Sequence, residues 1–433
     1  MYACTNRKRW NRNVDCKRKY VKKAAPTTKI FKKRVDSKLC SSIRGRIGEV
    51  VSAGKLKTPA IIRSHGGRAR AIEAEEVHID IAFLAAASSD EWGNAKGTGG
   101  KNNFGSIGFG IGDSRYVDNT VIITDIVVDC VCLVDEIASK EARFTDIPRE
   151  LMMIENAAKI IATTPYFKDG FSFQTGAGSP SLAVNRFIEE YMLERNIKMS
   201  FALGGVTNAI CKLLDKELVK SIIDVQDFDL GAIEHFTNNP KHFEVSSSEY
   251  TNPANKSAYV NKLDFVVLFA LEIDTNFNVN VITGSDGVLR GALGGHPDTA
   301  AGSKCCIIVT PLTRGRMTTV CENVVTITTP GDCVDILVTD YGTAVNPLRQ
   351  DLIEWLDKAG IKHVSIEELK NKVYSLVGTP ADLKWEDKVV ATVEARDGTI
   401  LNVVRKIIDK KINLLYYICM HIHIFFKGGL WKK

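Results

Sequence analysis

The chain has 433 residues, 45% hydrophobic and 25% charged, an ordinary globular composition that is long enough for two or three domains. Its net charge of +6 is uneven, because residues 1–40 carry +12 and residues 405–433 carry +6, which leaves −12 on the body between them. This distribution argues against a nucleic-acid-binding protein, no apolar run reaches the roughly 18 residues of a membrane span, and no apolar signal-peptide core follows the first methionine.

The eleven cysteines are scattered along the chain and include no CxxC pair. Cys130, Cys132, Cys305 and Cys306 lie inside apolar runs, which favours buried, reduced thiols over a disulfide framework or a zinc site. The cysteines therefore indicate a cytoplasmic protein, and the sequence predicts no metal site.

The first 43 residues are rich in Arg, Lys and Asn and show neither a helical nor an alternating hydrophobic period. We predict a basic, disordered extension here. The alternatives are an organellar transit peptide, suggested by the scarcity of acidic residues, and an RNA-binding arm, but no second feature supports either.

A short strand is predicted at 60–62, and the segment RSHGGRAR follows it at 63–70. A strand that ends in a Gly66-Gly67 turn with arginines on both sides can cradle a phosphate or a carboxylate through main-chain N–H groups and guanidinium groups. A surface turn with solvated arginines is the alternative.

The next predicted strand covers 79–86, and a polar, glycine-rich loop follows at 88–105. Residues 116–134 alternate weakly and are rich in Val and Ile, which predicts two buried strands of a parallel sheet. A proline at 148 then marks the start of a helix over 151–163, and we place a domain boundary just before it.

A predicted strand at 171–174 leads through a glycine turn into an amphipathic helix at 181–192. This succession offers main-chain N–H groups and the positive end of a helix to an anion, with Gly176 and Gly178 in the turn. The segment 201–206 repeats the design with Gly204-Gly205 at its end. Alone, such a turn is a weak signal, because many α/β folds have one.

The rest of the chain alternates strands, helices and turns. Residues 247–257 have turn chemistry and fit a surface or interface loop, and a central strand is predicted over 263–273. The later predicted elements are strands at 305–309 and 335–339 and helices at 352–359 and 366–373.

The stretch 281–302, VITGSDGVLRGALGGHPDTAAG, lies between two predicted strands and holds six glycines, two aspartates, one arginine and one histidine. Glycines let main-chain N–H groups approach a ligand closely, and polar side chains then orient it. The oxyanion that develops in a thioester or carboxylate reaction needs donors of this kind. A long polar loop between strands is the alternative.

The Ser285-Asp286-Gly287 turn and the segment 294–298 (GGHPD) resemble the substrate loop of the coenzyme A transferases, in which an acidic turn carries the active carboxylate and a Gly-Gly-x-x-Asp stretch forms an oxyanion site. The whole stretch is similar to the alpha subunits of citrate lyase, and so are HGGRARAIEA at 65–74 and the glycine turn after 174. The resemblance runs from about Arg44 to Val404.

The resemblance implies an α/β fold with two CoA-transferase-type domains, built of mostly parallel sheets flanked by helices, the first truncated at its N-terminus. The expected segments are a basic extension at 1–43, a partial first domain at 44–145, a second domain at 146–404 and an atypical apolar tail at 405–433.

It also implies an enzyme that exchanges acetate for citrate on an acyl carrier protein thioester, after which a separate beta subunit cleaves the citryl group to oxaloacetate. The thiol belongs to a dephospho-CoA-type prosthetic group, 2'-(5''-triphosphoribosyl)-3'-dephospho-CoA, on a gamma subunit, and none is attached to this chain. The expected partners are the beta and gamma subunits of an oligomeric cytoplasmic complex, together with citrate and acetate, and neither nucleic acid nor membrane.

The residue roles follow from the same resemblance. Asp286 is the expected active carboxylate, and Gly294 and Gly295 are the expected oxyanion donors. The expected substrate-binding residues are Arg290, His296, Asp298, Arg63 and His65, and the expected thioester- or phosphate-binding residues are Gly66, Gly67, Arg68, Gly176, Gly178, Gly204 and Gly205.

Many transferases of this superfamily use a glutamate as the nucleophile, whereas this chain has Asp286 at the matching turn. A covalent enzyme intermediate and a direct attack by citrate are both open, and the shorter carboxylate favours direct attack. Two alternatives of other classes are a related sugar-phosphate isomerase-like α/β protein and a catalytically impaired scaffold of the lyase complex.

Overall fold

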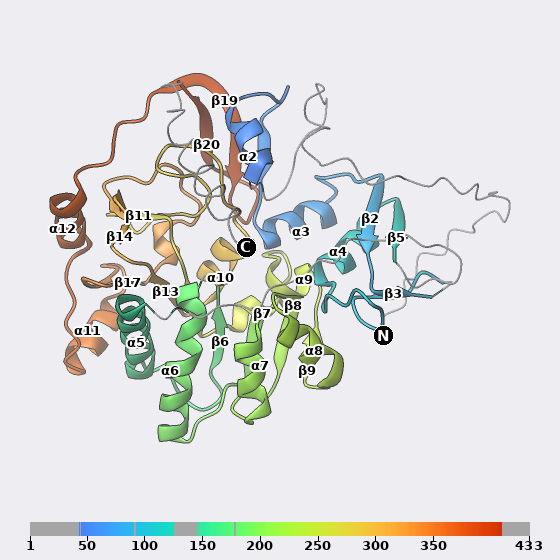
Figure 1. Cartoon of the computed structure of the whole chain (residues 1–433), viewed down its shortest axis with the longest axis horizontal. Coiled ribbons are helices and arrows are strands. Elements are labelled where there is room, and N and C mark those ends of the chain that lie inside the picture. Colours follow the sequence, from blue (N-terminus) through green and yellow to red (C-terminus); the bar gives the residue numbers. More distant parts are fainter. Residues whose placement is uncertain are drawn as a thin grey trace, which may run out of the picture.

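The structure is a computed structural model that describes residue 43 and residues 45–90, 92–124, 145, 147–176 and 179–408 (Figure 1). Four predictions lie outside these residues: the basic extension at 1–42, the second strand of the segment 116–134, the role of Gly178, and the tail beyond 408.

A central eight-stranded sheet forms the core of the molecule. All its neighbouring strands are parallel except the edge pair β17–β18, and helices cover both faces, which explains the continuous apolar runs in its strands. This confirms the predicted α/β fold with a mostly parallel sheet. In spatial order the strands are β18 (Gly342–Val345), β17 (Ile336–Thr339), β13 (Cys305–Val309), β10 (Phe265–Leu268), β6 (Ser172–Thr175), β7 (Phe201–Val206), β8 (Ile222–Asp227) and β9 (His242–Glu244).

One face of this sheet packs against helices α5 (Pro148–Thr163), α6 (Ser179–Arg195), α7 (Asn208–Asp215) and α11 (Gln350–Lys358), and Figure 1 shows α5, α6 and α7 side by side across it. Helix α5 packs there because its apolar residues Met153, Ala157 and Ile160 share one helical face and are buried. Proline in its first turn confirms the predicted helix start.

The opposite face carries shorter elements. They are α9 (Ser247–Thr251), the 3₁₀ helix η1 (Tyr259–Lys262), α10 (His296–Gly302), η2 (Gly331–Cys333), α12 (Ile366–Val377), the sheet β12 (Val279–Asn280), β11 (Glu272–Asp274) and β16 (Val320–Cys321), and the hairpin β14 (Thr313–Arg314) and β15 (Met317–Thr318). Helix α8 (Leu230–Asn238), near the β9 edge, instead packs beside α7 on the first face. The predicted strand 263–273 is therefore wrong as one element: it is β10 and β11, which belong to different sheets.

The first described segment shares a sheet with the last one. Strand β1 (Ala60–Ile62) pairs in parallel with β19 (Trp385–Glu394), which pairs with β20 (Ile400–Ile407), and α2 (Gly45–Ser52) packs on them (Figure 1, top). Their core includes Ile62, Leu289 and Val393. This sheet thus joins β1, from the predicted first domain, to β19, from the predicted second domain. The predicted end of the second domain, at residue 404, lies inside β20.

The remaining elements before residue 125 lie beside the β8–β9 edge, on the right in Figure 1. They are α3 (His65–Glu73), α4 (Gly108–Tyr116), the parallel pair β2 (Ile81–Ala85) and β5 (Asn119–Ile123), and the small hairpin β3 (Ser88–Ser89) and β4 (Ala95–Lys96). Strand β5 is partly exposed, unlike the buried strand predicted there.

Cys305 and Cys306 are buried free thiols, as predicted, whereas Cys130 and Cys132 lie outside the described residues. Cys211 and Cys321 are buried as well, and Cys333 is half-buried. None of the helices in the described part of the chain combines the length and apolarity that a membrane crossing requires.

Candidate functional site

The expected Gly66-Gly67 turn is the first turn of helix α3, so the prediction of a strand-to-turn cradle is wrong in its geometry. Ser64 caps the helix, its Oγ accepting a hydrogen bond from the Gly67 amide at 3.0 Å. Gly66 has to be glycine, because a Cβ there would lie 2.1 Å from the carbonyl oxygen of Thr251.

The N-terminus of α3 does bind a carboxylate, but the carboxylate is the protein's own Asp298. The Gly66 amide donates to Asp298 Oδ2 at 2.9 Å, and Ser64 Oγ and Arg396 Nε donate to Oδ1 at 2.8 and 3.2 Å. Asp298 is fully buried on α10, and this burial raises its pKa to about 6 against the three donors. Asp298 therefore fixes α10 to α3.

The main-chain N–H groups of Gly294 and Gly295 make no hydrogen bond within the described part of the chain. Gly294 has a φ of +57°, which glycine adopts without strain, and its carbonyl accepts from the His65 amide at 2.9 Å. A Cβ at Gly294 would lie 3.8 Å from the His65 ring, and one at Gly295 would lie 2.9 Å from the Tyr250 hydroxyl. Two free donors therefore lie next to an imidazole and a phenol.

The residues that support this imidazole were not among the predicted site residues. The His65 ring packs edge-on against Phe109 of α4, with ring centroids 4.5 Å apart, and its centroid is 6.5 Å from that of Tyr250. Tyr250 is buried, and its hydroxyl oxygen accepts from Gln174 Nε2 at 2.7 Å. Burial raises the Tyr250 pKa well above its ordinary value, so the group is a neutral phenol.

A local signal for Tyr250 was present in the sequence. Ser246 and Glu249 form a capping box that starts helix α9, and the S-x-x-E spacing is its signature. The prediction of a surface loop at 247–257 is therefore wrong at its start, since α9 is a buried helix that brings Tyr250 to the site.

Two of the arginines around α3 bind carboxylates of the protein. Arg63 forms a two-pronged ion pair with Glu394 of β19, at 2.5 and 2.8 Å, while its Nη1 is buried and has no hydrogen-bond partner among the described residues. Arg68 makes a similar pair with Asp113 of α4, at 2.7 and 2.8 Å. Arg68 thus links α3 to α4. Arg63, in contrast, has a buried Nη1 that makes no hydrogen bond within the described chain.

Asp286 lies at the tip of a hairpin bridged between Thr283 and Leu289. Both of its carboxylate oxygens accept hydrogen bonds from Arg290, one of them at 2.6 Å. Burial is the largest influence on the Asp286 pKa and acts to raise it, but the hydrogen bonds and charge of Arg290 and the Val288 amide together outweigh it, and the net pKa is below the ordinary value. Asp286 is therefore an ionised, half-exposed carboxylate.

The hairpin is seated on the β1–β19–β20 sheet rather than on α3. Gly287 has a φ of +74°, and a Cβ there would lie 2.3 Å from Ile407 and 2.7 Å from Trp385. Within the described residues, no hydrogen bond joins Asp286 to Gly294, Gly295 or His65. The loop thus has two separately supported halves, one with the carboxylate and one with the free amides.

Near Asp286 lie a buried carboxyl group, Glu272, and a half-buried guanidinium, Arg314, which the sequence did not predict as site residues. Glu272 accepts from Asn280 Nδ2 at 2.7 Å, and its pKa is raised, chiefly by burial and also by the charge of Asp286. Arg314 donates to the Leu271 carbonyl at 2.8 Å and has a buried Nε without a hydrogen-bond partner in the described chain.

The other half of the loop contains His296, whose two ring nitrogens both have protein partners. They lie 2.7 Å from Thr329 Oγ1 and 3.1 Å from the Phe269 carbonyl oxygen at the end of β10. Burial lowers the His296 pKa to about 4, so the ring is neutral near pH 7. Binding a substrate carboxylate would require His296 to give up one of these partners.

Gly204 and Gly205 are not a turn after a strand, as predicted, but lie inside β7. A Cβ at Gly204 would lie 2.5 Å from Gln174, and one at Gly205 would lie 2.0 Å from the Phe228 ring. Both glycines therefore make room for neighbouring side chains. Gly176 follows β6 as predicted, and its amide donates to the Val267 carbonyl at 2.8 Å.

Comparison with known proteins identifies the family. The chain matches the family described as citrate lyase, alpha subunit (CitF), over residues 19–132 and 126–407. It is 45% identical over 405 residues to the citrate lyase alpha chain of Haemophilus influenzae, covering 89% of this chain and 81% of that one. It is 47% identical over 387 residues to the citrate lyase alpha chain of Escherichia coli, covering 85% and 76%.

Solved structures agree. A crystal structure described as a citrate lyase alpha subunit in complex with citrate, from Streptococcus mutans, superposes with a TM-score of 0.83 at 47% identity, covering 86% of this chain and 78% of that one. A malonate decarboxylase alpha subunit from Acinetobacter baumannii shares the fold, with a TM-score of 0.56 at 15% identity over 80% and 75% of the two chains. The chain belongs to the citrate lyase alpha subunit family.

Proposed function

We propose that this chain is the transferase of a citrate lyase: it exchanges acetate for citrate on an acyl carrier protein thioester. The family membership supports the reaction class, and the relative from Streptococcus mutans was crystallised with citrate. The observation that carries the proposal is the pair of Gly294 and Gly295 amides, which are free of protein partners within the described chain and lie beside His65 and Tyr250.

The exchange can be written in two balanced steps. A citrate carboxylate oxygen attacks the acetyl carbonyl carbon, the C–S bond breaks, and a mixed acetic–citric anhydride and a thiolate form. The thiolate then attacks the citryl carbonyl of the anhydride, and acetate leaves. Each step passes through a tetrahedral intermediate with one negative oxygen, which is the group that the protein has to stabilise.

The Gly294 and Gly295 amides are the donors for that oxygen. Two main-chain N–H groups that are already held in place need no reorganisation when the charge develops, and the loss of one such donor typically reduces the rate by a factor of about 10² to 10³. The α3–α10 connection through Asp298 holds these amides, so the proposed role of Asp298 is to position the site rather than to bind citrate.

Asp286 and Arg290 act together in this proposal. The carboxylate is ionised, which suits a nucleophile, but both of its oxygens are held by Arg290. A covalent acyl-enzyme would require Asp286 to leave that pair. Direct attack by citrate needs a smaller change, in which a citrate carboxylate shares Arg290, so we favour direct attack.

Citrate has three carboxylates, and Arg290 serves one of them in this proposal. The buried Nη1 of Arg63 is the donor proposed for a second. His65 contributes its imidazole to the same pocket wall, beside Gly294. His296, with both nitrogens engaged, holds the loop against β10 unless substrate displaces a partner.

Gly176, just before α6, is still proposed to lie near the thioester arm, although its amide donates to the Val267 carbonyl. The arm itself is the dephospho-CoA-type prosthetic group of a gamma subunit. The beta subunit, which consumes the citryl thioester, is the second proposed partner. Their complex, proposed to be cytoplasmic, places this chain ahead of the cleavage to oxaloacetate.

The test is a single-turnover exchange assay. The purified full chain is mixed with acyl carrier protein that bears a labelled acetyl thioester, and the release of labelled acetate is followed after citrate is added. We expect citrate-dependent release and formation of citryl carrier protein. Binding to the carrier protein without release would identify a scaffold subunit instead, and turnover of a phosphorylated sugar without release would identify an isomerase-like protein.

A further inference from the structure

A second cluster of buried polar groups lies at the β8–β9 edge of the central sheet. Asp224 and Asp227 are on β8, His242 is on β9, and all three side chains are 0% exposed. Buried carboxylates and imidazoles are normally hydrogen-bonded or paired with an ion, because leaving them unpaired costs several kcal/mol. The proposed transferase chemistry uses none of these residues.

The atoms that face the centre of the cluster have no hydrogen bonds. They are Asp224 Oδ2, Asp227 Oδ1 and His242 Nε2, and each is buried without a hydrogen-bond partner within the described residues. His242 Nε2 lies 3.5 Å from the Asp224 oxygen and 4.0 Å from the Asp227 oxygen. These distances are too long for good hydrogen bonds.

The same distances suit the ligands of one metal ion. The three atoms all lie within 4.8 Å of one another, and with the two His242 distances at 3.5 and 4.0 Å a point equidistant from them lies about 2.0 to 2.4 Å from each, close to the length of Zn–N and Zn–O bonds. One imidazole and two carboxylates is a ligand set for divalent ions of the zinc and manganese kind. The distances and the ligand types therefore agree.

The outer atoms of both carboxylates are held by the main chain. Asp224 Oδ1 accepts from the Gln226 amide at 2.8 Å, and Asp227 Oδ2 accepts from the Ser106 amide at 3.0 Å. A Cβ at Gly105 would lie 1.7 Å from this Asp227 oxygen, so the Gly105 backbone is close against it. Such outer contacts orient metal ligands in known sites.

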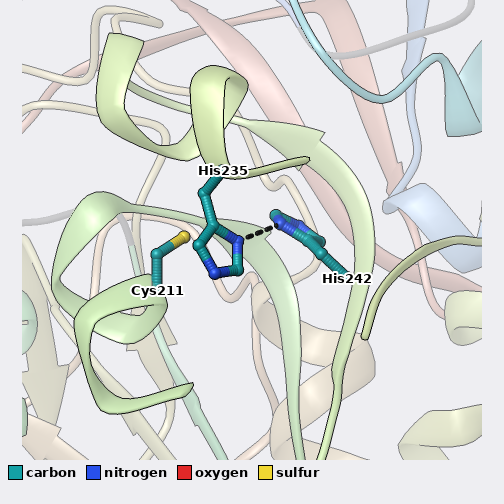
Figure 2. A group of neighbouring side chains, drawn as sticks. All are labelled: Cys211, His235 and His242. Carbon is teal, nitrogen blue, oxygen red and sulfur yellow. Dashed lines mark hydrogen bonds between the residues drawn. The ribbon is translucent and has the colours of Figure 1, made fainter. Parts of the chain in front are cut away.

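The outer nitrogen of His242 is held as well. Its Nδ1 lies 3.0 Å from Nδ1 of His235, and Figure 2 shows these two nitrogens facing each other. His235 Nε2 lies 3.4 Å from an Asp215 carboxylate oxygen, which favours a proton on that nitrogen. Asn239 Nδ2 lies 3.0 Å from the same nitrogen, so this tautomer has the Asn239 amide turned to present its oxygen instead. His235 Nδ1 then accepts from His242, whose Nε2 is left with a free lone pair.

We propose that Asp224, Asp227 and His242 bind one divalent metal ion of the zinc or manganese class, oriented by His235.

A rival set of ligands shares His242. Cys211, His235 and His242 also lie close together, and Figure 2 shows the Cys211 sulfur on the side of the His235 ring away from His242. If His235 and His242 bound one metal ion through their facing nitrogens, the Nδ1–Nδ1 hydrogen bond between them would be lost.

The position of the proposed metal gives it a structural role. Asp227 accepts a hydrogen bond from the Ser106 amide, and Glu244 of β9 accepts one from the Ile107 amide at 2.5 Å. Helix α4 begins directly after this segment and carries Phe109, which supports His65. An ion that fixes Asp227 therefore fixes the wall of the transferase site from behind, and should raise the thermal midpoint of the full chain.

The test uses the purified full chain after removal of metals with a chelator. Zn²⁺ or Mn²⁺ alone is titrated in a calorimeter, and we expect one equivalent to bind. Asp227→Asn should weaken binding at least 100-fold. The matched control is His78→Gln, which alters an exposed trio of His78, Asp80 and Asp118 and should leave binding unchanged. No stoichiometric binding by the unaltered chain, or loss of binding in His78→Gln alone, would overturn the proposal.

A second measurement needs no altered protein. Co²⁺ bound to the unaltered chain should give weak visible bands without a thiolate charge-transfer band, since the proposed ligands are nitrogen and oxygen. A strong thiolate band, or loss of binding in Cys211→Ser, would assign the ion to the Cys211 set and refute this one.

Discussion

The carboxylate of Asp298 accepts a hydrogen bond from the main-chain amide of Gly66, 232 positions earlier in the chain. This bond places a negative charge at the positive end of helix α3, a stabilising arrangement. It also brings His65, the first residue of α3, against Gly294, four residues before Asp298. The geometry of the proposed oxyanion site therefore depends on this contact together with the hydrogen bond from the His65 amide to the Gly294 carbonyl.

Replacing Asp298 by alanine should loosen that contact. The Gly66 amide, the Ser64 hydroxyl and Arg396 would each lose a partner, and we expect a loss of about 2 kcal/mol in the free energy of unfolding. Urea unfolding measures this loss. Asp397→Ala is the control, because Asp397 is exposed and its removal should cost less than about 1 kcal/mol. Equal losses in the two variants would contradict the role given to Asp298.

Gly295→Ala should reduce acetate release at least 100-fold, the size of effect seen when an oxyanion donor is lost. The added methyl would lie 2.9 Å from the Tyr250 hydroxyl, so the amide has to move. In Gly110→Ala, the matched control, the methyl meets Leu84 at an ordinary 3.7 Å, and full activity is expected.

A second change separates crowding from a general loss of structure. Tyr250→Phe removes the oxygen that the methyl added in Gly295→Ala would meet, and the next ring atom is 3.3 Å from that methyl. The double variant Gly295→Ala/Tyr250→Phe should therefore release acetate at least tenfold faster than Gly295→Ala. No recovery would mean that the position of the Gly295 amide is not what limits the exchange.

Arg290→Gln should move the acid limb of the pH–activity profile upward by about one pH unit. In the unaltered chain the hydrogen bonds and charge of Arg290, together with the Val288 amide, outweigh the effect of burial on Asp286, so the Asp286 pKa lies below its ordinary value. Without Arg290 the effect of burial remains, the pKa rises, and more of the carboxylate is protonated at a given acidic pH. Acetate release between pH 4 and 7 measures the limb, with the exposed Arg316→Gln as the control. An unmoved limb would show that Asp286 ionisation does not govern the rate.

Local patterns in the sequence predicted the elements whose signals are local. The apolar triplet Ala60–Ile62 is β1, and the proline followed by apolar residues at helical spacing is the start of α5. The glycine- and charge-rich stretch 281–302 does contain the free amides of the candidate site. In each case the deciding residues lie within a few positions of one another.

The failures come from partners that are distant in sequence. Gly66 lies in the first turn of helix α3 and forms no anion-binding turn for substrate, because Thr251 and Asp298 meet it from elsewhere in the chain. Gly204 lies inside strand β7, where the Gln174 side chain occupies the space that a Cβ would take. Glycine has the same local freedom in either role, so its neighbours, not its sequence context, decide what it does.

The pH dependence of stability should reveal two opposing effects on helix α10. The pKa of His296 is lowered from 6.5 to about 4, so His296 contributes stability above pH 6.5 that is lost as the pH falls toward 4. The pKa of Asp298 is raised from 3.8 to about 6, so its contribution is present below pH 3.8 and is lost as the pH rises through 6. Over nearly the same range, the two contributions have opposite slopes.

His296→Gln should separate these two effects, because glutamine keeps a polar side chain but does not titrate. At 1.36 kcal/mol per pKa unit, the lowered pKa of His296 corresponds to about 3 kcal/mol. The difference in unfolding free energy between the unaltered chain and the variant should therefore grow by up to about 3 kcal/mol from pH 4 to pH 6.5. Urea unfolding at half-unit pH steps measures it, and His363→Gln, at a more exposed histidine paired with Asp357, supplies the baseline. A difference that stays constant across this range would mean that His296 titrates in the folded protein as it does in the unfolded chain, against the buried, doubly bonded ring seen here.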